Sequence, residues 1–252
     1  MSFLKKLFGS SESNTIGFGL TDKGMVRKNN EDYFSIAEDR NFFVVADGMG
    51  GHKAGEVASK MAADSFVEFL SAETIREIHK NPAAIQHTII TGFYKVNQDV
   101  MDEAERNKDR RGMGCTLVIC FVDGEWAYVA HVGDVRCYLY ENGKLCQVTK
   151  DHSTFTDMEY TVGGEQVHKK RNVVTMGIGF SFPEDPELHQ IPTQAKGKLL
   201  LCSDGLWGMV DDEEIARILA SDIPPHEACE KLVAQANSAG GKDNVTALVV
   251  QL

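Results

Sequence analysis

The sequence predicts an α+β fold built on antiparallel sheet, and two observations favour this class. Apolar, β-branched stretches occur towards both ends of the chain, with paired helical patterns between them. Two hairpin signals, Asp123-Gly124 and Glu141-Asn142-Gly143, join or follow such stretches. Because hairpins connect antiparallel strands, α+β suits the pattern better than a wound βαβ fold.

The strands are expected where short runs are apolar and rich in branched side chains. These runs are Thr15–Leu20, Tyr33–Ala37, Phe42–Ala46, Thr116–Val122, Trp126–Val132, Arg136–Tyr140, Lys198–Cys202 and Val245–Leu252.

Helices are expected in four segments. The first is Gly55–Leu70, where the apolar stripe consists of Val57, Met61, Phe66 and Phe69. The second follows the start signal Asn81-Pro82, and its stripe consists of Ile85, Ile89, Phe93, Val96 and Val100. The last two are Asp211–Ala220 and Pro225–Ala239, the latter ending at Gly240-Gly241.

The segment 151–190 breaks this rhythm. It is rich in Gly, His, Lys and Glu and has weak periodicity. We therefore expect an irregular excursion on the surface, where functional loops tend to lie.

Composition excludes several classes of partner. The formal net charge is −11, which argues against nucleic acid or an anionic membrane as the main partner. No apolar run reaches transmembrane length, so no stable membrane insertion is expected. The six cysteines include no CxxC pair, and most lie in apolar runs, which favours a reduced, cytoplasmic protein. Residues 1–14 are expected to be a flexible tail, with a weak amphipathic anchor as the alternative.

Carboxylates recur where apolar strands meet loops. They lie at five places along the chain: Glu31 with Asp32, Asp47, Asp134, Asp204 and Asp243. A single Asp-Gly is usually a turn, but a strand end is a rigid mount, and the adjacent glycines let other backbone atoms approach. If these acids share one cleft, cations must neutralise them; the alternative is that they never meet.

Such a cluster favours hard cations. Oxygen ligands without nearby Cys or His suit Mg²⁺ or Mn²⁺. Two such ions about 4 Å apart share a water, lower its pKa and clamp an in-line phosphoryl displacement. Arg27, four residues before Glu31, offers a guanidinium that matches phosphate oxygens.

Seven motifs together resemble the bacterial branch of the protein phosphatase 2C family, the metal-dependent (PPM-type) protein phosphatases. In the family's order they are Gly24–Asp32, Val44–His52 (VVADGMGGH), Gly112–Leu117, His131–Arg136 (HVGDVR), Asp151–Ser153, Leu201–Trp207 (LCSDGLW) and Lys242–Thr246 (KDNVT). The resemblance covers about residues 15–252, which are expected to form a single catalytic domain. It implies a four-layer α-β-β-α sandwich, in which helix pairs flank two central antiparallel sheets and the metals lie at one end.

The resemblance also implies a role for each site residue. One metal would be bound by Asp47, Asp204 and Asp243, and the other by Asp47, the Gly48 carbonyl and Glu31, partly through water. Asp134 with Asp204 resembles a third, weaker site. Arg27 matches the phosphate-binding arginine, while Asp32 and Asn244 are expected to orient the ligands.

Two departures from the family pattern concern the chemistry. Eukaryotic members have a histidine directly after the Asp-Gly pair, which is thought to protonate the leaving group; here that position is Met49. His52 or a metal-bound water is an alternative proton donor, and His52 could instead fix its loop. The flap-like segment Asp151–Arg171 also looks shorter than in common bacterial members.

Other phosphatase chemistries lack their signatures. No cysteine has an arginine six positions later, and no DxD motif is present, which excludes the usual thiol and aspartyl-phosphate nucleophiles.

From the resemblance we expect phosphorylated protein substrates, a cognate Ser/Thr kinase as partner, and a monomer. The competing hypotheses are a non-catalytic module that binds phosphoproteins or a kinase, and a phosphatase of small metabolites or of partner-switching regulators.

Overall fold

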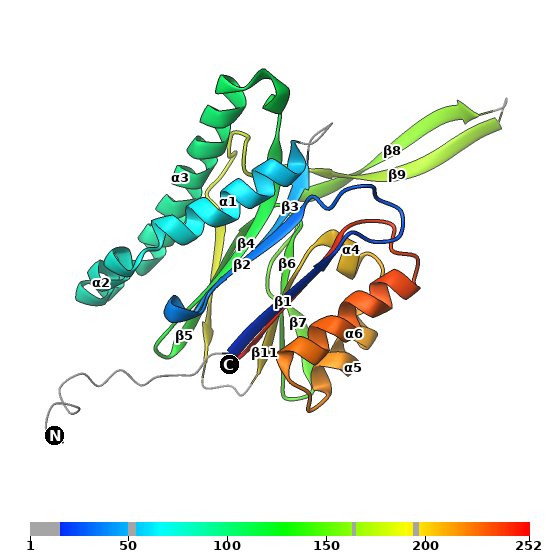
Figure 1. Ribbon diagram of the computed structural model, residues 1–252. Helices are drawn as coiled ribbons and strands as arrows, with labels where there is room; N and C mark the ends of the chain where they lie inside the picture. The colour runs from blue at the N-terminus through cyan, green and yellow to red at the C-terminus, as the bar shows by residue number, and fades with distance from the viewer. Residues whose placement is uncertain (1–15, 50–53, 163–164, 194–196) are drawn as a thin grey trace, which may run out of the picture.

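The structure is a computed structural model of the chain, and it describes residues 16–49, 54–162, 165–193 and 197–252. Two five-stranded antiparallel sheets lie face to face with helices on both outer sides, which confirms the predicted four-layer sandwich (Figure 1). The first sheet runs in the order β1 (Ile16–Asp22), β12 (Val245–Gln251), β11 (Lys198–Cys202), β6 (Arg136–Glu141) and β7 (Lys144–Gln147). The second runs β10 (Glu187–Pro192), β5 (Trp126–Val132), β4 (Gly114–Asp123), β3 (Phe42–Met49) and β2 (Asp32–Ala37).

Helices cover the outer face of each sheet. On the second sheet these are α1 (Gly55–Phe69) and α3 (Ile85–Arg106), with α2 (Ala72–Lys80) between them in sequence. On the first sheet they are α5 (Asp212–Ala220) and α6 (Pro225–Ser238), preceded by the single turn α4 (Asp204–Trp207). Short 3-10 turns lie at Glu38–Arg40, Pro82–Ala84 and Lys108–Arg110.

Each sheet buries both of its faces, which explains why the strands read as continuous apolar runs. In β3, Phe42, Val44 and Ala46 face the helical layer. The alternate residues, Phe43 and Val45, face the other sheet. Because successive side chains of a strand point to opposite faces, a strand buried on both sides has no polar positions to alternate with.

The expected core stripe of α1 is only partly correct. Phe66 is fully buried, but Val57, Met61 and Phe69 are only partly buried against the core. The buried face of α1 is made mainly of small residues, namely Gly55, Ala58, Ser59, Ala62 and Ala63. Small side chains let the helix axis approach the sheet closely. The large apolar residues, from which the stripe was predicted, lie mostly at the edge of this interface. In α3, by contrast, all five expected residues are buried.

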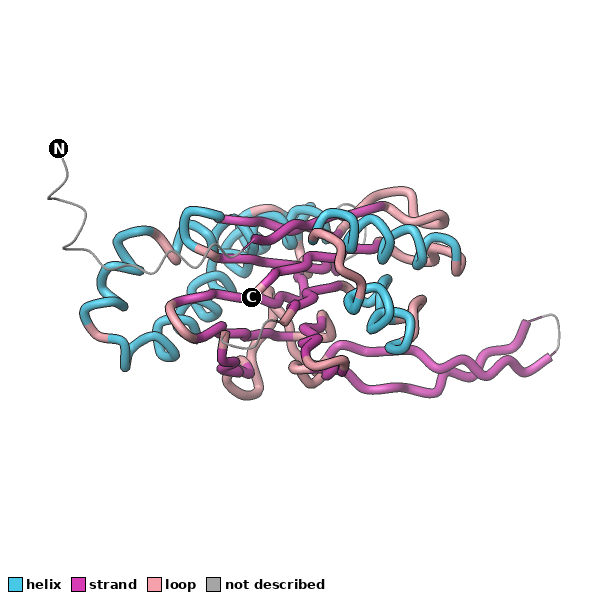
Figure 2. Tube along the Cα trace, turned by 90° about the horizontal axis from the view of Figure 1, so that it is seen from below, coloured by secondary structure: helices cyan, strands magenta, loops and turns pink. Residues whose placement is uncertain are grey.

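The segment 151–190 is more regular than expected. It contains β8 (Ser153–Val162) and β9 (Glu165–Val174), which form a separate two-stranded sheet, and the start of β10. We call β8 and β9 the arm, because the pair extends away from the sandwich (Figure 2). Because this hairpin forms a sheet of its own and is not a strand pair of either layered sheet, the sandwich does not impose an alternating pattern on its sequence.

Other expectations are met or fall outside the described residues. The hairpin signals are confirmed: Gly124 joins β4 to β5, and Asn142 and Gly143, both with positive φ, join β6 to β7. The expected tail, residues 1–14, lies outside the described residues. None of the helices in the described part of the chain is both long enough and apolar enough to cross a lipid bilayer.

The core stripe of α3 makes a stability prediction. Ile89 is fully buried, whereas His87 on the same helix is exposed. We expect Ile89→Ala to lower the free energy of unfolding by about 2–5 kcal/mol, because it removes apolar contacts and leaves a cavity. His87→Ala should change it by less than about 0.5 kcal/mol. Urea unfolding of both variants checks this, and equal losses would contradict the assigned face.

Candidate functional site

The strand-end carboxylates come together in one cavity of about 270 Å³. Every metal-ligand candidate lines it, namely Glu31, Asp47, Gly48, Asp134, Asp204 and Asp243, together with Arg27 and Asn244. The sequence left open whether these acids meet in space. They do meet, although they come from segments that lie up to about two hundred residues apart.

The layered fold accounts for this meeting. Asp47 lies near the end of β3, where Asp32 is its partner on β2 and Thr116 its partner on β4. Asp204 follows β11 and Asp243 precedes β12, so both belong to the same end of the other sheet. Asp134 lies in the link that crosses from β5 in one sheet to β6 in the other. The cavity therefore lies where the two sheets end together.

Asp32 ties the two sheets together behind the cavity. Its Oδ2 accepts hydrogen bonds from Ser203 Oγ at 2.6 Å and from Thr246 Oγ1 at 2.7 Å. Ser203 Oγ in turn accepts the Thr246 N–H at 3.0 Å. Asp32 is 5% exposed. It therefore supports the cavity from the buried side, as a residue that orients the ligands would.

Asn244 holds the loop that carries Glu31. Its amide Nδ2 donates to the carbonyls of Lys23 and Asn29, both at 2.9 Å, and its Oδ1 accepts the Glu31 N–H at 2.8 Å. The Glu31 carbonyl accepts the Gly48 N–H at 3.1 Å, which links that loop to the end of β3. One amide side chain thus fixes Glu31 relative to Asp243.

Two glycines make the close approach possible. A Cβ at Gly48 would lie 2.3 Å from the Gly55 carbonyl oxygen. A Cβ at Gly205 would lie 1.9 Å from the Asn244 carbonyl oxygen. Real Cβ atoms do not approach backbone oxygens so closely, so only glycine fits at these positions.

Arg27 lies at the mouth of the cavity and pairs with one of its acids. Its Nη2 is 2.5 Å from Asp243 Oδ2, and its side chain is 49% exposed. The exposed half leaves donors free to reach an anion that enters from solvent.

Burial and mutual repulsion make these carboxylates reluctant to ionise. Burial, with the neighbouring Asp134 and Asp243 charges, raises the pKa of Asp204 to about 7. Burial, with the Asp32 and Asp204 charges, raises the pKa of Asp47 well above its ordinary value. Burial also raises the pKa of Asp32 to about 6, although hydrogen bonds from Ser203 and Thr246 oppose the shift.

The donor set fits hard divalent cations. The described residues that line the cavity offer carboxylate oxygens and the backbone carbonyl of Gly48, and none of these residues is a histidine or a cysteine. Two divalent ions would remove the repulsion that raises these pKa values. The cavity therefore offers oxygen ligands of the kind that hard divalent cations prefer.

Sequence reasoning missed part of the cavity wall. Asn172, from β9 of the arm, donates from Nδ2 to Asp134 Oδ2 at 2.7 Å, and Val174 and Thr116 also line the cavity. No sequence pattern indicated Asn172, because its contact with Asp134 depends on where the end of β9 meets the sandwich. Met49 lines the cavity as well. His52 lies outside the described residues, so its predicted role stays a prediction.

Comparisons with known proteins agree with this geometry. A family model described as Protein phosphatase 2C matches residues 25–242. The serine/threonine phosphatase stp of Listeria innocua is 36% identical over 242 residues, which cover 92% of this chain and 93% of that protein. Protein phosphatase PhpP of Streptococcus pneumoniae is 35% identical over 243 residues, which cover 92% and 96%. The crystal structure of the Mycobacterium tuberculosis serine/threonine phosphatase PstP/Ppp is 30% identical, has a TM-score of 0.79, and covers 94% of this chain and 98% of that one.

These similarities extend well beyond the acidic motifs. The family model spans most of the chain, and both curated relatives cover more than nine-tenths of it. Because the match includes the sandwich as well as the residues at its end, the chain belongs to the protein phosphatase 2C family of metal-dependent serine/threonine protein phosphatases.

Proposed function

We propose that this chain hydrolyses phosphoserine and phosphothreonine in proteins, with the acidic cavity as its active site. The observation that carries the proposal is the convergence of carboxylates from five separate segments on one cavity, with Arg27 at its mouth. Carboxylates that are partly buried and clustered in this way need divalent cations to neutralise them, and a guanidinium beside such cations is suited to a phosphate ester.

The ligands are assigned to two core ions and a weaker third, all Mn²⁺ or Mg²⁺. Asp47, Asp204 and Asp243 would hold one ion, and Asp47, the Gly48 carbonyl and Glu31 the other. Asp134 and Asp204 would hold the third. When bound, such ions would supply Lewis acidity and lower the pKa of a water, which is the chemistry that direct hydrolysis of a phosphoester by water needs.

The protein's own groups place the phosphate and keep the ligands in position. Arg27 binds the phosphate oxygens through its free N–H groups. Asn244 holds the Glu31 loop, and Asp32 holds the two sheets at a fixed separation behind Asp47. Met49 has no proton to give, so the leaving alkoxide takes its proton from another group, for which His52 is the residue we assign.

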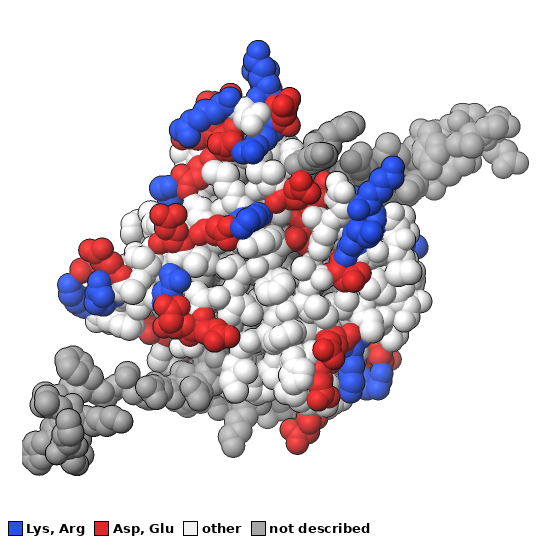
Figure 3. Space-filling model, in the orientation of Figure 1, with Lys and Arg blue, Asp and Glu red and all other residues white. Residues whose placement is uncertain are grey.

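The reaction and the state of the cysteines support proposals for the partner and the cellular compartment of the chain. A protein phosphatase depends on a Ser/Thr kinase to supply its substrates, and we assign a cognate kinase as partner and a monomer as the active form. All six cysteines are free, and five of them are buried. This supports a reducing compartment such as the cytoplasm. On the face shown in Figure 3, acidic and basic side chains are interspersed, as expected for a chain that does not use nucleic acid as its main partner.

The first prediction from the proposed function concerns turnover. Hydrolysis of a phosphothreonine peptide should require Mn²⁺ or Mg²⁺. Asp204→Asn should lower kcat by at least about 100-fold, equivalent to roughly 2.7 kcal/mol in activation free energy, because a shared ligand is lost. The matched control is Asp64→Asn, which alters an exposed acid on α1 and should leave turnover unchanged. Wild-type protein without activity on peptide and small phosphoesters, with every divalent ion, would favour the non-catalytic binding module.

A second prediction separates phosphate binding from the chemistry. Arg27→Ala should raise KM for the peptide and the inhibition constant of inorganic phosphate by about 10-fold or more, because charge-assisted hydrogen bonds are lost. Arg27→Lys should recover only part of this, since lysine lacks the planar fork. An unchanged inhibition constant for phosphate in Arg27→Ala would remove Arg27 from the phosphate site.

A third prediction uses the raised pKa values. With the pKa of Asp32 at about 6 and that of Asp204 at about 7, the folded metal-free protein binds more protons than the unfolded chain between about pH 4 and 7. These groups therefore stabilise the fold less as pH rises through this window. Metal-free protein should show a steeper loss of thermal midpoint from pH 5 to 7.5 than Asp204→Asn does. Saturating Mn²⁺ should raise the midpoint most at the higher pH. Identical pH slopes for the two proteins would contradict a shared carboxylate site.

A further inference from the structure

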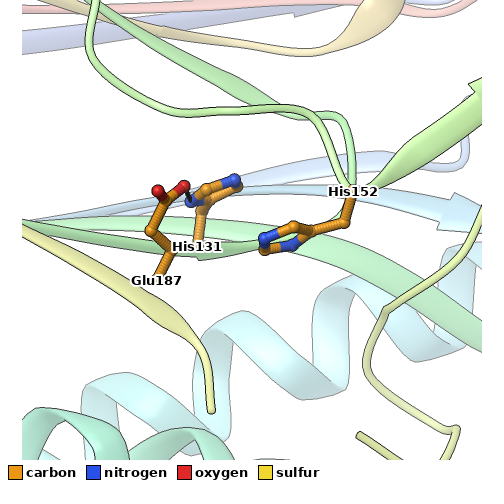
Figure 4. A group of neighbouring side chains, drawn as sticks. All are labelled: His131, His152 and Glu187. Carbon is orange, nitrogen blue, oxygen red and sulfur yellow. Dashed lines mark ion pairs between the residues drawn. The ribbon is translucent and has the colours of Figure 1, made fainter. Parts of the chain in front are cut away.

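A second group of metal-binding side chains lies outside the acidic cavity. It consists of His131 at the end of β5, His152 just before β8, and Glu187 at the start of β10 (Figure 4). One ligand atom from each lies within 4.8 Å of the other two. None of the three lines the cavity that holds Asp47, Asp204 and Asp243. We call this group the histidine cluster.

Strand pairing brings the cluster together. Glu187 lies directly opposite His131 in the β10–β5 pair, so their side chains share one face of the sheet. His189, two residues along β10, lies on that same face, and its Nε2 is 3.5 Å from Glu187 Oε2. His152 enters from the segment before the arm, and its ring stacks on His131 with centroids 4.5 Å apart.

The hydrogen bonds of His131 leave one nitrogen lone pair without a donor. Its Nε2 lies 2.8 Å from the Lys150 carbonyl oxygen, which can only accept, so Nε2 carries the hydrogen. His131 is fully buried, and its Nδ1 has no hydrogen-bond partner. Burial also lowers the pKa of His131 to about 4, which keeps the ring neutral. A metal-bound histidine commonly has this arrangement, with one nitrogen donating to a backbone carbonyl and the other free for the ion.

The atom that faces this lone pair is another acceptor. Glu187 Oε2 lies 3.8 Å from His131 Nδ1, too far for a hydrogen bond. His189 Nε2, 3.5 Å from the same Glu187 oxygen, is also buried without a hydrogen-bond partner. Glu187 Oε2 accepts the Lys150 N–H at 3.2 Å, but the two imidazole nitrogens near it make no hydrogen bond, and a cation bound there would satisfy them.

We propose that His131 Nδ1, His152 and Glu187 bind one zinc-class divalent ion, separate from the ions of the acidic cavity. Imidazole and carboxylate ligands suit Zn²⁺, with metal–ligand distances of about 2.0–2.2 Å. The His131–Glu187 separation is already close to what two ligands of one such ion require. His189 lies within reach as a fourth ligand.

Binding requires one local movement. The His131 and His152 rings are nearly parallel, with 9° between their planes, and two parallel stacked rings cannot both direct a lone pair at one ion. His152 therefore turns about its Cβ–Cγ bond and releases the Gly133 N–H, which its Nδ1 accepts at 3.2 Å. The bound ion would then connect β5 and β10 to the residue from which the arm begins.

Cobalt spectroscopy tests the site without using phosphatase activity. Protein stripped with a chelator is placed in excess Mg²⁺, which prefers the oxygen ligands of the cavity, and is titrated with Co²⁺. One equivalent bound by imidazole and carboxylate should give the intense visible absorption of four-coordinate Co²⁺, and Zn²⁺ should abolish it by displacement. Absence of that absorption, or of any Zn²⁺ uptake measured by competition with a chromogenic chelator, would overturn the proposal.

Matched variants locate the ion. Glu187→Gln and His152→Gln should each weaken Zn²⁺ binding by at least about 100-fold, since loss of an outer partner alone costs roughly 10–100-fold. Glu184→Gln makes the same chemical change at an exposed position outside the cluster and should bind as wild type does. Asp204→Asn should also retain the ion. Loss of Zn²⁺ binding in Asp204→Asn, with retention in Glu187→Gln and His152→Gln, would place the ion in the acidic cavity and refute the histidine cluster as a site.

Discussion

Repulsion among partly buried carboxylates at one end of the sandwich is the constraint on which the rest of the site depends. The charges of Asp204 and Asp243 help to raise the pKa of Asp47, and the Asp243 charge also helps to raise that of Asp204. An arrangement of this kind persists only if rigid elements hold the acids together against that repulsion. Here the rigidity comes from β3 in one sheet and from β11 and β12 in the other. Asp32 joins the two sheets through the hydroxyls of Ser203 and Thr246.

The four-layer architecture provides this rigidity through the packing of its cores. Apolar cores on both faces of each sheet fix the strands, so their ends can carry charge without loss of register. Close approach at the ends then relies on positions such as Gly205, where any side chain would collide with the Asn244 carbonyl. The sheets fix the strand ends, and hydrogen bonds from polar side chains such as Asn244 fix the loops beside them.

The sequence predicted those features that depend on local pattern. Strands such as Phe42–Ala46 were evident because both faces are buried, and Asp47 was evident because it ends such a strand. Features that depend on packing between elements were not. The buried face of α1 was misplaced because small residues such as Ala58 and Ala62 give a weak apolar signal even where contact is closest. The position of Asn172 could not be predicted, because its contact with Asp134 depends on where β9 lies relative to the sandwich.

The ion pair between Arg27 and Asp243 couples the two kinds of ligand that this cavity is suited to hold. A cation that binds Asp243 competes with the guanidinium for the same carboxylate oxygen, and so releases Arg27 donors towards solvent. A phosphate that draws the Arg27 guanidinium away from Asp243 would in turn free that carboxylate for the cation. By thermodynamic reciprocity each ligand then raises the affinity of the other by the same factor. The cavity would therefore behave as a cooperative pair of sites, in which the inorganic phosphate left after hydrolysis slows the departure of the metal.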